Sequence, residues 1–288
     1  MMAPLWAGAF GAWAQVQNRV ASQARSPRMP VLFLGHGSPM NAIEDNSYRR
    51  SWQALGQEFG ARYPKPQLIV CVSAHWLTQG WWFTGAARPK TIHDFGGFPQ
   101  ALFDQQYPAL GAPEQARDLA RSVSATRIQL DEGEWGYDHG TWSVLKPMFP
   151  KADIPLVQLS MDYSQPPATH YALARELRRW RERGVLIVGS GNIVHNLRQS
   201  RRGAPSIQAY DWALEFDQTV ARQIEQGDLD ALQRFQQLGT VAQQAHPTWE
   251  HYLPLLYTAA VVDAKEPVRF FNTSFQSASI AMRSVVWG

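Results

Sequence analysis

The fold is decided by the stretch Val31-Leu32-Phe33-Leu34-Gly35-His36-Gly37-Ser38-Pro39. Its first four residues are all apolar, which is the pattern of a short buried strand. The strand leads directly into Gly-His-Gly, and glycine on both sides lets other groups approach the backbone closely. Because open α/β sheets bind ligands at the carboxyl ends of their strands, the stretch predicts a strand that brings the imidazole of His36 to such an edge.

Two further apolar runs repeat this pattern. Residues 68–74 lead to His75 and Trp76, and residues 185–188 lead through Gly-Ser-Gly-Asn to His195. Three strands would then each bring a histidine to the same edge of a sheet. A metal site is commonly built in this way from residues that are far apart in the sequence.

The rest of the chain alternates between strand-like and helical patterns. Residues 47–62 form an amphipathic helical pattern, and residues 166–183 form a helix that ends at Gly184. Further strands are predicted at residues 81–84, 154–161, 268–275 and 279–287, and further helices at residues 113–124, 141–148, 206–226, 229–238 and 252–262. This alternation predicts an α/β three-layer sandwich around a mixed, mostly parallel sheet, in a single domain.

Residues 1–28 differ in composition from the rest of the chain. They contain a small apolar stretch that lacks the basic region of a signal peptide and is too short to span a membrane. We interpret them as an N-terminal extension that is disordered or precedes the true start at Met29, with a poor export signal as the alternative. The domain itself is predicted to cover residues 29–288.

The composition is that of an ordinary globular protein, with 45% hydrophobic and 18% charged residues and a net charge of +3. The arginine-rich segment 175–183 fits the solvated face of a helix, and basic residues do not alternate with aromatic ones, so neither nucleic acid nor a membrane is expected as a partner. The single cysteine, Cys71, lies in an apolar strand and cannot form an intrachain disulfide. This usage fits a reducing compartment and predicts a cytoplasmic location, while the oligomeric state is left open.

Several common catalytic motifs are missing from the sequence. Residues 189–194 begin like a dinucleotide fingerprint, but Val194 stands in place of the third glycine. There is no Walker lysine, no Gly-x-Ser-x-Gly elbow and no His-Glu-x-x-His helix.

Eight histidines remain as candidates for the chemistry. Neutral imidazoles suit Fe(II) and Zn(II), and a catalytic metal needs three or four such ligands with an open position. His170 and His246 are best interpreted as hydrogen-bonded structural residues. The stronger candidates are those at strand ends and loop junctions, namely His36, His75, His195 and His251.

Long motifs along the chain resemble the 4,5-DOPA extradiol dioxygenase family, which belongs to the LigB-type class III ring-opening dioxygenases. They lie at residues 29–41, 73–76, 91–99, 135–142, 191–197 and 250–254, so the resemblance covers nearly everything after Met29. It implies that family's α/β fold, a single non-haem metal, and insertion of both atoms of O₂ into a small catechol. By the same resemblance the substrate would be DOPA-like and would undergo 4,5-cleavage to a seco-DOPA semialdehyde.

The resemblance also implies roles for individual residues. His36, His75 and His251 match the metal ligands, and His195 matches a histidine near the metal that is either an acid/base or a fourth ligand. His139 lies in a glycine-hinged loop that should face the substrate.

Two more residues are predicted to contact the substrate. Trp76 follows His75 directly, and His93 lies in the long glycine-rich loop at residues 89–100.

One departure from the pattern of class III enzymes concerns the metal ligands. Class III enzymes often use two histidines and one carboxylate, whereas the third position here is His251, with Glu250 just before it. An all-histidine site tolerates zinc, so we expect one divalent metal, Fe(II) for activity, with Zn(II) also able to occupy the site. Two alternatives remain open at this point: a zinc-dependent hydrolase that activates water with the same histidines, and a non-catalytic protein that binds aromatic molecules.

Overall fold

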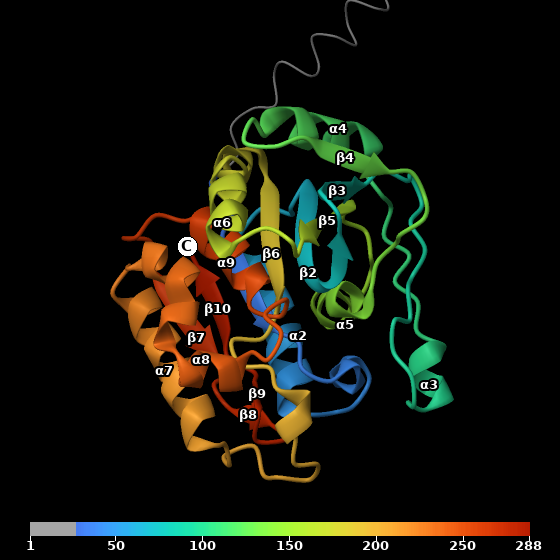
Figure 1. Ribbon diagram of the computed structural model, residues 1–288. Helices are drawn as coiled ribbons and strands as arrows, with labels where there is room; N and C mark the ends of the chain where they lie inside the picture. The colour runs from blue at the N-terminus through green and yellow to red at the C-terminus, as the bar shows by residue number, and fades with distance from the viewer. Residues whose placement is uncertain (1–26) are drawn as a thin grey trace, which may run out of the picture.

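A sheet of eight strands runs through the molecule in the order β4-β3-β5-β2-β6-β1-β10-β7 (Figure 1). This computed structural model describes residues 27–288. The four central strands are parallel neighbours, namely β5 (Leu156–Asp162), β2 (Leu68–Thr78), β6 (Val185–Gly191) and β1 (Val31–Gly35). Antiparallel pairs join β3 (Trp81–Thr84) to β5, β10 (Ser284–Trp287) to β1, and β7 (Val268–Phe271) to β10, while β4 (Ile128–Asp131) lies parallel to β3. The predicted mixed, mostly parallel sheet is confirmed.

Both faces of the sheet are covered by helices, which explains why β1 is apolar throughout. Val31 and Phe33 pack into the core on one face, and Leu32 and Leu34 pack into the core on the other. One layer is formed by η1 (Pro39–Ala42), α2 (Ser47–Arg62) and α5 (His139–Met148). The other contains α6 (Pro167–Arg175), α7 (Asp211–Glu225), η4 (Leu229–Leu238), α8 (Thr240–Ala245) and α9 (Leu253–Ala260). The three-layer sandwich is therefore confirmed as well.

Local signals set the main helices. The Asn46 side chain accepts a hydrogen bond from the backbone N–H of Arg49 and caps α2, which buries Trp52, Leu55 and Phe59 along one stripe. Every residue of α9 is buried, as expected for a helix that lies between the sheet and a second row of helices. The remaining short elements are α3 (Gln100–Phe103), α4 (Pro113–Ser122), η2 (Arg178–Arg183) and η3 (Leu197–Gln199).

The structure differs from the sequence prediction in several places. The predicted helix at 166–183 divides into α6 and the 3₁₀ segment η2. The two predicted closing strands are each interrupted, the first at residues 272–274, where Asn272 adopts a left-handed backbone conformation, and the second at residues 282–283. Between the interruptions lie β8 (Phe275–Gln276) and β9 (Ile280–Ala281), which pair with each other as a separate small sheet.

The third difference concerns β2, which continues past His75 to Thr78. Pairing with β6 stops at Ser73, whereas pairing with β5 resumes at Leu77 after a shift in register. His75 therefore lies within an irregular part of the strand, a local geometry that re-aims side chains at sheet edges.

The proposed N-terminal extension falls almost entirely outside the described residues. Within residues 27–288, no helix has the length and apolarity that crossing a bilayer requires.

Candidate metal centre and its cavity

Three adjacent parallel strands bring the first two histidines together. Gly35, at the end of β1, pairs with Gly191 of β6, and His36 follows directly. His75 lies just beyond the last paired residue of β2 on the other side of β6. The first turn of α5 packs closely on this point, since a Cβ atom on Gly140 would lie 2.9 Å from Cδ2 of His75.

His251 reaches the same point from the helical layer, in the turn before α9. Its carbonyl oxygen accepts a hydrogen bond of 2.9 Å from the backbone N–H of Asn192, immediately after β6. A Cβ atom on Gly191 would clash with that carbonyl oxygen. Glycine at the end of β6 is therefore what allows His251 to lie directly against the strand.

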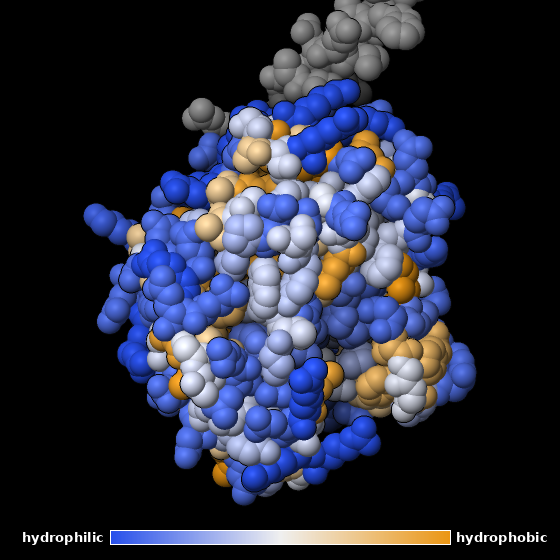
Figure 2. Space-filling model, viewed as in Figure 1, coloured by the Kyte–Doolittle hydropathy of each residue, from blue (hydrophilic) through white to orange (hydrophobic). Residues whose placement is uncertain are grey.

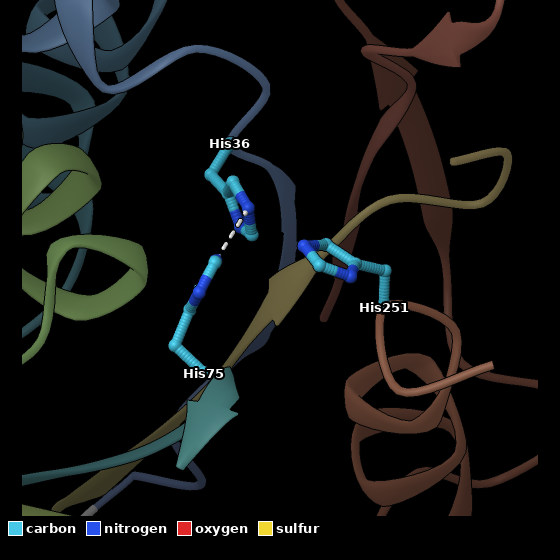
Figure 3. Close-up of side chains that lie close together, drawn as sticks. All are labelled: His36, His75 and His251. Carbon is cyan, nitrogen blue, oxygen red and sulfur yellow. Dashed lines mark hydrogen bonds between the residues drawn. The ribbon is translucent and has the colours of Figure 1, made fainter. Parts of the chain in front are cut away.

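The three imidazoles point toward one another (Figure 3). The Nε2 atoms of His36 and His75 are 3.3 Å apart. One nitrogen each of His36, His75 and His251 lies within 4.8 Å of the other two. Residues from three parts of the chain thus form one compact cluster of nitrogen donors.

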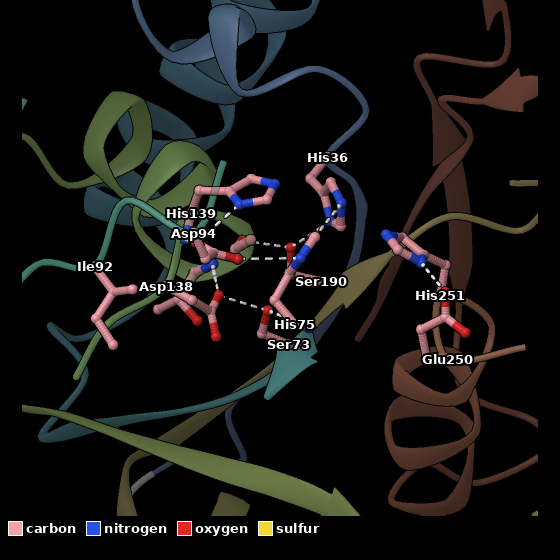
Figure 4. A network of polar contacts seen from close by, with 12 residues as sticks. His36, Ser73, His75, Ile92, Asp94, Asp138, His139, Ser190, Glu250 and His251 are labelled. Atoms are coloured by element: carbon pink, nitrogen blue, oxygen red, sulfur yellow. Dashed lines mark hydrogen bonds and ion pairs between the residues drawn. The ribbon is translucent and has the colours of Figure 1, made fainter. Parts of the chain in front are cut away.

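The ring of His36 is held through its other nitrogen. Nδ1 lies 3.1 Å from the Ser190 hydroxyl, and that hydroxyl donates its own hydrogen to the carbonyl oxygen of Gly140 (Figure 4). The hydroxyl oxygen is then free only to accept, so Nδ1 carries the proton. The lone pair of His36 is therefore on Nε2, which faces the cluster.

Carboxylates hold the other two rings in the same way. Nδ1 of His75 lies 3.2 Å from Oδ2 of Asp94, and Nδ1 of His251 lies 3.1 Å from Oε1 of Glu250 (Figure 4). A carboxylate can only accept, so each pair favours the tautomer with its proton on Nδ1. Partners of this kind fix the tautomer and the orientation of metal-binding histidines in proteins.

Burial keeps the rings of His36 and His251 neutral. It is the largest cause of pKa values well below the ordinary histidine range for His36 and His251, and the neighbouring imidazoles lower both further. A neutral ring is the form that donates a lone pair to a metal.

The donor set fits a single divalent ion. Two nitrogens bound to one metal at about 2.0–2.1 Å with tetrahedral angles lie roughly 3.3–3.4 Å apart. The separation of 3.3 Å between the Nε2 atoms of His36 and His75 matches this value. Without an ion, two lone pairs at that distance would repel each other.

His195 lies next to the cluster but is held differently. Its ring stacks on that of His251, with ring centroids 3.5 Å apart and the planes inclined by 5°. A nitrogen of His195 comes within 4.8 Å of His251 and Glu250, but it does not belong to the group formed with His36 and His75. Burial, followed by the charges of nearby histidines, lowers the pKa of His195 to about 3.

His139 borders the histidine cluster on the side of His75. It begins α5, and its ring centroid lies 3.9 Å from that of His75. Its Nδ1 lies 3.0 Å from Oδ1 of Asp94, and its backbone N–H donates to the same oxygen. Burial raises the pKa of Asp94, but the contacts with His139 and His75 outweigh this and hold it well below the usual range.

A cavity of about 1030 Å³ opens over these five histidines. Hydrophobic side chains gather over α3 in Figure 2, and the surface beside them is hollowed. The cavity walls combine aromatic and aliphatic side chains with a few polar ones, including Phe95, Phe98, Phe275, Ile280, Tyr48 and Arg202. Its volume is at the upper end of small-molecule sites and is more than a bare catechol requires.

The structure does not bring the other two predicted substrate contacts to this cavity. The Trp76 indole is buried and stacks on Trp135, with centroids 5.8 Å apart and the planes inclined by 3°. His93 uses its Nε2 in a 2.9 Å contact with the carbonyl oxygen of Gln105 and packs near Trp142. Each side chain packs instead against another segment, Trp76 against the loop before α5 and His93 against the chain at Gln105 and Trp142.

Sequence reasoning assigned no role to Asp94 or Ser190. Both lie in segments that the motifs had singled out, but which side chain would meet which imidazole depends on the folded path of each loop. For Glu250, the only signal of a role was its position directly before His251 in the sequence.

Residues 30–286 match the model of the family described as the catalytic LigB subunit of aromatic ring-opening dioxygenase, and the chain belongs to that family. The protein is thus an extradiol aromatic ring-opening dioxygenase, and metal dependence is a property of its family.

The chain is similar to proteins named 4,5-DOPA dioxygenase extradiol. The one from Escherichia coli K12 is 47% identical over 268 residues, covering 91% of this chain and 96% of the relative. The one from Beta vulgaris is 33% identical over 234 residues, covering 78% and 84%. A crystal structure of an uncharacterized protein from Escherichia coli K12 matches with a TM-score of 0.77 and 40% identity, covering 91% of this chain and all of the other.

Proposed function

We propose that the protein opens the ring of a DOPA-like catechol by 4,5-cleavage with O₂, and that His36, His75 and His251 hold the metal it needs. The observation that carries this proposal is the convergence of three imidazoles whose tautomers leave Nε2 bare toward one another. A protein that merely bound aromatic molecules would not need three such nitrogens. The substrate class is taken from the names of the similar proteins from Escherichia coli and Beta vulgaris.

Fe(II) is the proposed active metal. When bound, it supplies a redox-active centre through which electrons pass between a catechol and O₂, which otherwise react slowly because O₂ is a triplet. Zn(II) fits the same three nitrogens but has no accessible redox couple, so it would occupy the site without supporting turnover.

The protein's own residues bind and orient the catechol and move protons. Phe95, Phe98 and Ile280 give the cavity apolar walls that receive an aromatic ring and exclude water from it. His139 lines the cavity beside His75, where it can donate a hydrogen bond to a catechol oxygen or accept one from it.

His195 is the proposed acid/base. Its buried ring is neutral before substrate binds, so one ring nitrogen has a lone pair available for the proton that a catechol loses on binding. It can later return that proton to the oxygen that leaves when the O–O bond breaks. The stacking on His251 places this ring beside the donor cluster without making it one of the three mutually close nitrogens. This arrangement favours the acid/base role over that of a fourth ligand.

The proposal is tested by loading the protein with Fe(II) without air, then adding a panel of catechols and air. Oxygen uptake with a new visible absorbance is expected for DOPA-like members of the panel. The Zn(II)-loaded protein, prepared in parallel, should consume no oxygen. An iron-loaded protein that takes up no oxygen with any catechol would contradict the proposal, and water-dependent hydrolysis with zinc would then be the function to test.

We also propose the extent of the catalytic domain and the cellular location of the protein. Residues 29–288 form the catalytic domain, since Met29 is buried and its backbone N–H bonds to the carbonyl oxygen of Arg181. A cytoplasmic location is proposed because the single cysteine, Cys71, is buried and free.

A further inference from the structure

One carboxylate touches two different histidines of the site. Asp94 places Oδ2 3.2 Å from Nδ1 of His75 and Oδ1 3.0 Å from Nδ1 of His139 (Figure 4). Oδ1 also accepts a 2.9 Å hydrogen bond from the backbone N–H of His139. Both oxygens are therefore committed to the site, one to each histidine, and the side chain itself lines the cavity.

The loop that carries Asp94 is tied to the segment that carries His139. The backbone N–H of Ile92 donates to the carbonyl oxygen of Tyr137 at 2.7 Å, and that of Tyr137 donates to the carbonyl oxygen of Lys90 at 2.8 Å. The indole N–H of Trp142 donates to the carbonyl oxygen of Ile92 at 2.9 Å. These bonds fix the path of the loop at residues 90–92, just before Asp94, so the carboxylate is presented in one place.

Glu250 provides the contrast within the same site. Its carboxylate contacts Nδ1 of His251 at 3.1 Å and accepts a hydrogen bond from the Thr248 hydroxyl. Among the described residues it hydrogen-bonds to none that is proposed to act on the substrate, although a nitrogen of His195 lies within 4.8 Å, and it does not line the cavity. Glu250 can therefore influence one proposed ligand, whereas Asp94 can influence a proposed ligand and a substrate-facing ring together.

We propose that Asp94 is a positioning residue that orients both His75 and His139, and so couples retention of the metal to the handling of the substrate. This inference rests on the proposed function, in which His75 is a ligand and His139 faces the catechol. Partners that orient metal-binding histidines typically contribute about 10- to 100-fold in metal affinity or activity.

The experiment compares Asp94→Asn and Glu250→Gln with Asp162→Asn. Asp162 is a matched control, because it is a buried carboxylate at the same edge of the sheet that bonds only Gly80 and Ser164. Zn(II) affinity is measured by competition with a coloured chelator, and turnover is measured after saturation with Fe(II). Thermal unfolding of each variant shows whether it is folded.

We expect Zn(II) affinity to fall about 10- to 100-fold in Asp94→Asn and in Glu250→Gln, and to change little in Asp162→Asn. Saturating Fe(II) should restore the larger share of turnover to Glu250→Gln. It should leave Asp94→Asn about 10-fold or more below the wild type, because the ring of His139 stays misplaced when the metal is present.

Two results would overturn the inference. Wild-type Zn(II) affinity in a folded Asp94→Asn protein would remove the link to His75, and wild-type turnover of its iron-saturated form would remove the link to His139. If Asp94→Asn does not fold, Asp94→Glu serves instead. It keeps the charge but adds one methylene, so it should retain most of the metal affinity and lose turnover, and unchanged turnover would contradict the proposal.

These outcomes are separate from failure of the proposed function. A wild-type protein that binds zinc but opens no catechol would contradict the proposed reaction, while its zinc affinity would still test the contact between Asp94 and His75.

Discussion

The edge of the sheet and the helical layer beside it both bury histidines, but they hold them in different ways. In the helical layer, Nδ1 of His170 bonds to the Tyr257 hydroxyl at 2.8 Å, and Nε2 of His246 bonds to the carbonyl oxygen of Ile193 at 2.6 Å. The nearest rings are those of Trp81, Trp249 and Tyr257 for His170, and of Phe216, Phe235 and Tyr252 for His246. Each of these histidines bonds through one ring nitrogen and lies among aromatic rings, while its other nitrogen has no hydrogen-bond partner among the described residues.

At the sheet edge, each proposed ligand is held at Nδ1 and turns Nε2 toward another imidazole. Burial does not distinguish the two regions, since His36 is 2% exposed and His170 is 0% exposed. What differs is whether the second nitrogen faces other nitrogens or hydrocarbon. A functional histidine in this fold is therefore recognised by the direction of its free nitrogen.

The largest effect is expected from removing a proposed ligand. His36→Ala, His75→Ala and His251→Ala should each lose bound metal and all measurable turnover while staying folded, because two nitrogens hold a divalent ion poorly. Elemental analysis of the purified variants measures this. His170→Gln is the control from the helical layer and should retain its metal. Full metal occupancy in any alanine variant would remove that residue from the ligand set.

The next effect concerns His195, which lies at the border of the two regions. We expect His195→Gln to keep most of its iron and its catechol binding but to lose about 10²- to 10⁴-fold in kcat, the usual contribution of a positioned acid/base. Iron occupancy and single-turnover rate, measured on one preparation, test this. Loss of iron with rescue by added Fe(II) would instead make His195 a fourth ligand.

A smaller effect should appear when the helical layer is acidified. Burial lowers the pKa of His170 to about 4, below the value of 6.5 for an exposed histidine. Between these two values the unfolded chain binds a proton that the native protein does not, so this residue lowers stability as the pH falls through that window. The cost reaches about 2–3 kcal/mol near pH 4.5.

His170→Gln should remove that part of the pH dependence. Urea unfolding of the wild type and the variant at pH 7.5 and at pH 4.5 gives the difference, and comparing the two proteins cancels contributions from the other histidines. An equal loss of stability in both proteins would show that His170 does not titrate in this way.

The smallest effect is expected at the proposed domain boundary. A chain that begins at Met29 should turn over normally. Of the described residues it loses only Pro27 and Arg28, and the ion pairs of Arg28 with Asp263 and Glu266 are partly exposed. Exposed pairs contribute about 0–1 kcal/mol. The melting temperature should therefore change by no more than about 2–4 °C. A larger drop on truncation would mean that the extension packs against the domain.

Much of the fold could be predicted from sequence because its signals are local. The apolar runs of β1, β2 and β6 end in glycine or histidine, and parallel strands place such ends together. The interruption of the first closing strand was not predictable, since it depends on the left-handed conformation of Asn272, which carries no glycine signal. The short strand β4 was missed as well, because residues 128–131 are only half apolar.

The candidate site also combines features that local sequence predicts with features that only the folded chain sets. The four histidines proposed as ligands or acid/base are marked by their position after strands or before a helix. The direction of a side chain is not marked by its position in the sequence. Trp76 follows His75 directly and yet turns away to stack on Trp135. Asp94 is the converse case, because its partners are set by hydrogen bonds that tie its loop to Tyr137 and Trp142.

The position of β1 has a consequence for when the site can form. This strand carries His36, but it lies between β6 and β10, which are made late in synthesis. While the ribosome is still adding the middle of the chain, His36 has neither neighbouring strand, and His251 has not yet been made. The growing chain therefore lacks a complete set of the proposed ligands until residue 251 has been made, and the proposed metal centre cannot form before then.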